Sequence, residues 1–236
     1  MRVFAIADIH LSKAQPKPMN IFGPEWAGHP EAVFEEWRRV VGEDDLVIVA
    51  GDISWAMKLP EAMADLEDLA RLPGRKVLLR GNHDYWWPSI SRLRQALPPR
   101  MHALQNDALV IGNLAVAGSR GWDTPGSYHF TPEDEKIYKR EVERLQLSLK
   151  SLKNQHYDHL VLAMHYPPFG PTGGPTGFTE LIERYRPTCV VYGHLHGADP
   201  TRLPPSWDGI PLHFVAADAL RFRPKLVLET AHNPQG

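Results

Sequence analysis

Length and composition favour a soluble protein with one domain over residues 1–236, because 43% of the chain is hydrophobic and 23% is charged. The formal net charge of −2 provides no general attraction to nucleic acid or to anionic membranes, so neither is expected as a partner. A lone cysteine, Cys189, excludes an internal disulfide, and the apolar start ends at Asp8, too early for a signal peptide or a membrane span, so we expect a cytoplasmic protein.

Short apolar runs alternate with amphipathic segments along the chain. The apolar runs predict strands at residues 3–7, 46–50, 76–79, 109–111, 114–117, 159–164, 188–192, 212–215 and 225–228. The amphipathic segments predict helices at residues 31–41, 60–72, 88–97 and 179–185, and a longer one that begins at Pro132 behind the N-cap Thr131. Residues 11–30, which hold four prolines, are expected to be loop. This alternation favours an α/β fold, and the hairpin and tail strands favour a mixed sheet.

Five of the predicted strands end in polar clusters that carry metal-binding side-chain types. The clusters are Asp8 with His10, Asp52, Asn82-His83-Asp84, His165, and His194 with His196. Open α/β sheets place their ligands beyond the carboxyl ends of the strands. We therefore expect these clusters to converge in one crevice.

The side chains in these clusters favour divalent manganese, iron or zinc. Imidazole nitrogens suit these ions better than calcium or magnesium, which prefer oxygen ligands, and the lack of a thiolate argues against a closed structural zinc site. In Asp8-x-His10 and His194-x-His196, residues two apart can lie on the same side of an extended segment. The seven candidate ligands suffice for two ions if one carboxylate bridges them, and Asp52, alone on its loop, is the natural bridge.

The order of these motifs resembles that of the calcineurin-like metallophosphoesterase superfamily. The matching motifs are Asp8-x-His10, Gly51-Asp52, Gly81-Asn82-His83-Asp84, His165 and Gly193-His194-x-His196. The resemblance implies two mixed β-sheets packed as a sandwich between helices, in four αββα layers, with two divalent metal ions. It implies one ion held by Asp8, His10, Asp52 and His196, and a second held by Asp52, Asn82, His165 and His194. His83 would then be the catalytic histidine outside the ligand set.

The resemblance implies hydrolysis of a phosphate ester, and loop residues beside the motifs bear on the substrate. Protein serine/threonine phosphatases carry an acidic residue and an arginine shortly after the Gly-Asp motif, whereas this chain continues from Gly51-Asp52 into Ile53-Ser-Trp-Ala-Met57. That difference argues against a phosphoprotein substrate. Arg120 is the loop arginine that could contact a phosphoryl group, and Trp55 and Trp122 could form an apolar wall, although each tryptophan could equally serve loop packing. We expect a small phosphodiester or nucleotide-like substrate.

Three other functions stay open at this point. A phosphomonoesterase of the same fold would use the same ligands. A nuclease would need a basic groove, for which the net charge gives no support. A non-catalytic metal-binding scaffold would be expected to lose ligands, and none of the seven is missing. His29 and His129 lie in loops that could also reach the crevice.

Overall fold

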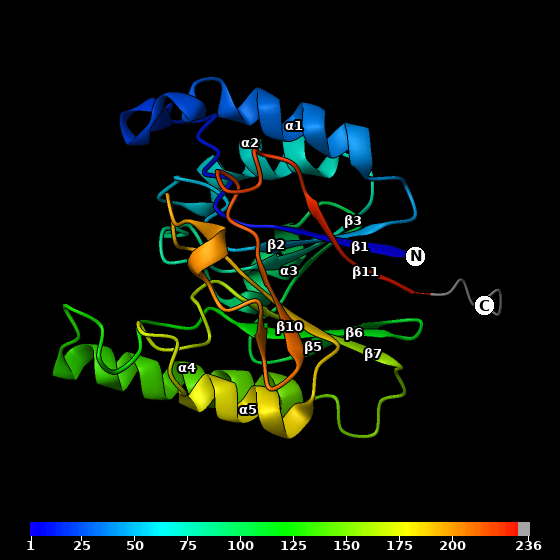
Figure 1. Ribbon diagram of the computed structural model, residues 1–236. Helices are drawn as coiled ribbons and strands as arrows, with labels where there is room; N and C mark the ends of the chain where they lie inside the picture. Colours follow the sequence, from blue (N-terminus) through cyan, green and yellow to red (C-terminus); the bar gives the residue numbers. More distant parts are fainter. Residues whose placement is uncertain (231–236) are drawn as a thin grey trace.

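The computed structural model describes residues 1–230, which form two β-sheets packed face to face between helices (Figure 1). The first sheet contains, in spatial order, β11 (Lys225–Glu229), β1 (Arg2–Ile6), β2 (Leu46–Ala50), β3 (Arg75–Leu79) and β4 (Met101–Ala103). Strands β1 to β4 are parallel, and β11 adds antiparallel to β1 at the edge. The carboxyl ends of three consecutive motif-bearing strands therefore lie side by side.

The second sheet is also mixed. Its order is β5 (Ala108–Ile111), β6 (Leu114–Ser119), β7 (His159–Met164), β8 (Cys189–Tyr192), β10 (Ile210–Phe214) and β9 (Ser206–Trp207). The four central strands are parallel, and β5 and β9 pair antiparallel at the two edges. The predicted hairpin is confirmed as β5 and β6, and its turn includes Gly112 at φ 58°.

Alternate residues of the strands fill the space between the sheets. Val3 and Ala5 of β1 and Ile48 of β2 belong to the same buried cluster as Val116 of β6 and Val161 of β7. The residues between them point to the outer faces, where helices cover them. Because both faces of the parallel strands are buried, their sequences are continuous apolar runs rather than alternating patterns.

Helices cover the outer face of each sheet. Helices α1 (His29–Val40), α2 (Leu59–Ala70) and α3 (Ile90–Ala96) pack on the first sheet, and α4 (Pro132–Lys150) and α5 (Gly177–Tyr185) pack on the second. Figure 1 shows α1 and α2 along one side of the molecule and α4 and α5 along the opposite side. The predicted N-cap of α4 is confirmed, because Thr131 accepts a hydrogen bond from the Asp134 amide. The four-layer αββα sandwich is confirmed.

Several short elements were not predicted. They are β4, β9 and the 3₁₀ helices η1 (Met19–Phe22), η2 (Pro24–Trp26) and η3 (Pro200–Arg202). Each is too short to show a hydrophobic period, so the prediction of unbroken loop over residues 11–30 was wrong at η1 and η2. The single domain over residues 1–236 stays a prediction, since its last six residues lie outside the described part. Within residues 1–230, no helix combines the length and apolar character that a membrane crossing requires.

Candidate metal centre

The predicted metal ligands and His83 follow the carboxyl ends of β1, β2, β3, β7 and β8, and backbone hydrogen bonds join their loops. The Asp8 amide donates to the Gly51 carbonyl, and the His10 amide donates to the Asp52 carbonyl. The Gly193 amide donates to the His165 carbonyl, so the loops of the second sheet are joined in the same way. The parallel strands thus bring residues far apart in sequence together at one edge of the sandwich.

Asp8, His10, Asp52 and His196 form the first group of potential ligands. Their ligand atoms all lie within 4.8 Å of one another, and the first three side chains are buried. His10 Nε2 is 3.0 Å from His196 Nε2, and Asp8 Oδ1 is 3.6 Å from the same His196 nitrogen. Asp8 Oδ1 has no hydrogen-bond partner within residues 1–230. A buried carboxylate oxygen in that state, facing two imidazoles, fits a metal ion.

Asn82, His165 and His194 form a second group around the other side of Asp52. Asn82 Oδ1 lies 2.7 Å from His165 Nε2 and 3.1 Å from His194 Nδ1. Asp52 Oδ2 lies 3.5 Å from His165 Nε2 and 3.8 Å from His10 Nε2. The same carboxylate oxygen therefore faces both groups.

The environment of His165 and His194 prepares their nitrogens to bind a cation. His165 Nδ1–H donates to the Ala50 carbonyl over 3.0 Å, which leaves Nε2 facing the oxygens of Asn82 and Asp52. Burial lowers the pKa of His165, but the carboxylates of Asp52 and Asp8 outweigh it and raise the pKa to about 9. Burial and the neighbouring His165 lower the pKa of His194 to about 3, so its ring is neutral at pH 7. His165 Nε2 and His194 Nδ1 both face the Asn82 oxygen, and His165 Nε2 also faces Asp52, so a proton or a metal ion is needed between these atoms.

Four of the predicted ligands have an unusual backbone conformation. Asp8, His10, Asp52 and His194 have φ values of 60°, 45°, 52° and 71°. Residues other than glycine rarely adopt this left-handed region, and each instance costs about 1–3 kcal/mol. The cost indicates that the surrounding structure holds these residues for a functional purpose.

Two glycines permit the close packing of the ligand carboxylates. A Cβ atom at Gly81 would overlap Asp52 Oδ1, and one at Gly193 would overlap Asp8 Oδ2. Backbone amides near these glycines bind the same carboxylates. The His83 amide donates to Asp52 Oδ1, and the His194 amide donates to Asp8 Oδ2. The glycines in both motifs are therefore required by close approach of the chain.

Asp84 holds the ligand loops together and does not face the metal groups. Its fully buried carboxylate accepts hydrogen bonds from the Ile53, Ser54 and Gly81 amides at 2.9, 3.2 and 2.7 Å. It also accepts one from Trp86 Nε1 at 3.0 Å. These contacts tie the loop after β2 to the loop after β3.

Replacing Asp84 with alanine should destabilise the protein. Each buried donor left without a partner costs about 1–3 kcal/mol, and four donors lose theirs, so we expect a loss of about 3 kcal/mol or more. Urea unfolding followed by circular dichroism measures the loss. A loss below about 1 kcal/mol, the value of one ordinary hydrogen bond, would show that Asp84 has no such bracing role.

His83 lies beside the two ligand groups. Its ring centroid is 5.8 Å from that of His10 and 4.6 Å from that of Trp55. Its Nδ1 is buried without a hydrogen-bond partner among the described residues. Burial lowers the pKa of His83. The side chain is free to contact a bound substrate.

Trp55 packs directly on the ligand groups. Its ring stacks on His10 at 4.7 Å and 17°, and its Nε1 donates to Met19 Sδ. The Lys17 ammonium lies 3.6 Å from the centroid of the same ring. Trp55 therefore supports His10 and carries a cation at the crevice. Lys17 was not predicted from the sequence, because a lone loop lysine gives no signal.

Trp122 lines an apolar cavity of about 260 Å³ that reaches the second ligand group. Tyr166, Phe169 and Leu203 line the same cavity, as does His194. The Tyr166 ring lies 3.9 Å from that of His194 and 5.3 Å from that of Trp122. An apolar group bound here would lie beside the metal centre.

Arg120 lies against Glu141. Its Nη2 is 3.2 Å from the Glu141 carboxylate, and its guanidinium lies 4.5 Å from the Trp122 ring centroid. The Arg120 carbonyl accepts hydrogen bonds from the His165 and Tyr166 amides. The arginine therefore positions the loop after β7 through its backbone.

Two further residues position the ligands and were not assigned from the sequence. Asp218 Oδ2 lies 3.8 Å from His196 Nδ1 and accepts a hydrogen bond from the Gly197 amide. His29 is buried, and its Nε2 lies 3.1 Å from the Ile9 carbonyl and 3.2 Å from the His10 carbonyl. His29 thus reaches the backbone of the Asp8-x-His10 loop and not the ligand groups themselves.

This geometry agrees with comparisons to known proteins. Residues 1–198 match the family of calcineurin-like phosphoesterases. The chain belongs to this family. Members are phosphoesterases that use divalent metals, and the predicted family resemblance is confirmed.

One curated relative and two solved structures are similar over most of the chain. The gene 66 protein of Mycobacterium phage D29 is 26% identical over 196 residues, which are 82% of this chain and 78% of that protein. The phosphopantetheinyl hydrolase PptH of Mycobacterium tuberculosis has a TM-score of 0.61 and 17% identity, covering 100% of this chain and 98% of its own. The protein TT1561 of Thermus thermophilus has a TM-score of 0.54 and 16% identity, covering 82% of this chain and 81% of its own. At these identities the two structures show the fold alone.

Proposed function

We propose that the protein hydrolyses a phosphate ester at a centre of two divalent metal ions, manganese, iron or zinc. The observation that carries the proposal is the position of Asp52 Oδ2, 3.8 Å from His10 Nε2 and 3.5 Å from His165 Nε2. Asp8, His10 and His196 would hold one ion, Asn82, His165 and His194 would hold the other, and Asp52 would bridge them. Two such ions activate water for in-line attack and neutralise charge on the phosphoryl oxygens.

His83 would act directly on the substrate. Asp52 and the other ligands would be bound to the metal ions. The His83 ring, which has no hydrogen-bond partner at Nδ1 among the described residues, would remain to donate a hydrogen bond to a phosphoryl or leaving-group oxygen. Lys17, held over Trp55, adds positive charge at the same edge of the crevice. Both residues act on charge that develops during the reaction.

The preferred substrate would be a small phosphodiester. A monoester is close to a dianion at pH 7, and enzymes selective for it commonly add arginine clamps. Here Arg120 is paired with Glu141. The second group of a diester fits instead into the apolar cavity of Trp122, Tyr166 and Phe169 beside His194. The cavity supports a diester or nucleotide-like substrate over a phosphoprotein.

The substrate proposal predicts that the enzyme prefers a diester to a monoester and that this preference depends on Trp122. With saturating Mn²⁺, kcat/KM for bis-p-nitrophenyl phosphate should exceed that for p-nitrophenyl phosphate. Trp122→Ala should lower the diester value about tenfold, as expected when an apolar wall worth roughly 1–3 kcal/mol is removed, and change the monoester value little. Trp207→Ala, in β9 at the edge of the second sheet, is the matched control.

A clear preference for the monoester that Trp122→Ala leaves unchanged would overturn the substrate proposal. Cyclic nucleotides and a phosphopantetheinyl ester belong in the same panel, the latter because a protein of similar fold is named for that hydrolysis. A protein that binds two metals and hydrolyses none of these esters would support the non-catalytic scaffold instead.

A further inference from the structure

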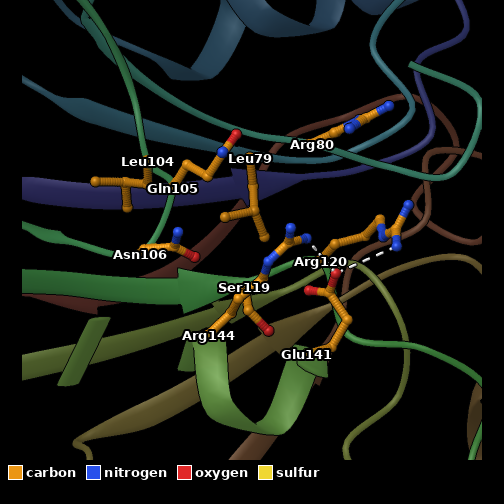
Figure 2. Close-up of a pocket in the computed structure, with 9 residues that line it drawn as sticks. All are labelled: Leu79, Arg80, Leu104, Gln105, Asn106, Ser119, Arg120, Glu141 and Arg144. Atoms are coloured by element: carbon orange, nitrogen blue, oxygen red, sulfur yellow. Dashed lines mark hydrogen bonds and ion pairs between the residues drawn. The ribbon is translucent and has the colours of Figure 1, made fainter. Parts of the chain in front are cut away.

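A small cavity between the two sheets gathers arginines outside the metal centre. It has a volume of about 50 Å³ and lies where β3 and β6 end, over helix α4. Figure 2 shows Arg80 on one side and Arg120 and Arg144 on the other, with Glu141 between the latter two. Its lining residues are distinct from the seven candidate metal ligands.

The charges in this cavity are not balanced. Glu141, which is 1% exposed, accepts from Arg120 over 3.2 Å and from Arg144 over 2.7 Å. One carboxylate thus serves two guanidinium groups, and Arg80 adds a third positive charge. Burial and the charge of Arg120 lower the pKa of Arg80. An arginine stays protonated in proteins, so the cavity keeps a net positive charge.

Two hydrogen-bond donors of the residues that line the cavity also lack acceptors. The Nε atoms of Arg80 and Arg120 are both buried without a partner among the residues that the structure describes. Gln105, whose Oε1 accepts a hydrogen bond from Trp87 Nε1, also lines the cavity. Buried donors of this kind cost free energy unless an acceptor binds them.

We infer that the cavity binds a small oxyanion of the phosphate type. Guanidinium groups bind phosphate through paired charge-assisted hydrogen bonds, and excess positive charge selects an anion over water alone. A volume of about 50 Å³ admits one tetrahedral group and excludes a nucleoside. The anion is either free phosphate or the terminal phosphoryl group of a larger molecule whose remainder stays in solvent.

The anion would brace the loops that carry metal ligands. Arg80 stands two residues before Asn82, and the Arg120 carbonyl accepts the His165 amide. An anion that contacts both Arg80 and Arg120 therefore links the loop after β3 to the loop after β7. The site is a second phosphate site and not part of the hydrolytic crevice.

Calorimetric titration of the metal-loaded protein with orthophosphate tests this inference. The wild type should bind two phosphates per chain, one at the metals and one in the arginine cavity. Arg144→Gln should weaken the second site about tenfold or more, because a charge-assisted hydrogen bond is lost. Arg140→Gln, an exposed arginine one turn away on α4, should leave both sites unchanged.

Two more variants give independent readouts. Glu141→Gln removes the competing carboxylate and should tighten the second site, opposite in sign to Arg144→Gln. Asp52→Asn should abolish the phosphate bound at the metals and keep the one in the cavity, so failure of the metal proposal leaves this test intact. The inference is overturned if Arg144→Gln and Glu141→Gln both bind phosphate with wild-type stoichiometry and affinity.

Competition with other anions for the second site distinguishes free phosphate from the phosphoryl group of a larger molecule. Displacement of the second phosphate by O-phosphoserine or methyl phosphate identifies the phosphoryl end of a larger molecule. Displacement by sulfate alone identifies a free tetrahedral ion.

Discussion

Replacing Asp52 with asparagine should empty both halves of the metal centre. Its Oδ2 faces both ligand groups, and its Oδ1 is fixed by the His83 amide at 2.8 Å. Asparagine keeps the shape but removes the charge that would bridge two cations. Loss of an outer-sphere partner alone costs about 10–100-fold in metal affinity or activity, so loss of the bridge should cost more than about 100-fold in kcat.

Elemental analysis after dialysis measures this effect together with kcat. Asp199→Asn, at an exposed carboxylate that caps η3, is the control and should retain wild-type metal content. Two metals at full occupancy in Asp52→Asn would contradict the bridging assignment. One retained metal would show that one ligand group holds its ion without Asp52.

Replacing His83 with alanine should separate chemistry from metal binding. The ring lies beside His10 and Trp55, whereas its backbone amide, which the substitution keeps, holds Asp52. We expect kcat to fall by about 10²–10⁴-fold, the range for a lost general acid or charge-stabilising donor. Metal content and unfolding temperature should stay close to wild type.

The matched control is His102→Ala, an exposed histidine on β4. It should leave both kcat and metal content unchanged. If the metal content of His83→Ala falls in step with its activity, His83 is a ligand and its proposed catalytic role is wrong. A larger effect on diesters with poor leaving groups would identify His83 as the acid that protonates the leaving oxygen.

Much of the fold could be predicted because the parallel strands are buried on both faces. Continuous runs such as Leu46–Ala50 and His159–Met164 are typical of such strands, and the polar residue after each run marks its carboxyl end. The elements that were not predicted are too short to show a hydrophobic period. Met101–Ala103 has three residues, and Ser206–Trp207 forms only because Pro211 pairs with Ser206 in the folded sheet.

The ligand types and their order could also be predicted, since each lies next to a strand end. The contacts that hold them could not. Asp218, which lies near His196, has no signal in the sequence. His29 was considered for the crevice, but its contact with the backbone of the Asp8-x-His10 loop could not be predicted. Trp55 stacks on His10, a contact that the sequence does not indicate, and its place in a substrate wall stays a prediction. A substrate contact of Arg120 stays a prediction, and its ion pair with Glu141 of helix α4 could not be predicted because it depends on how that helix packs on the sheet.

Titration of metal-free protein with Mn²⁺ tests whether two metal ions share Asp52. Electron paramagnetic resonance should show an exchange-coupled manganese pair, and phosphodiesterase activity should rise with the second equivalent. This result is expected because both ligand groups face one carboxylate oxygen. Full activity at one equivalent, or two ions with uncoupled spectra, would contradict a bridge through Asp52.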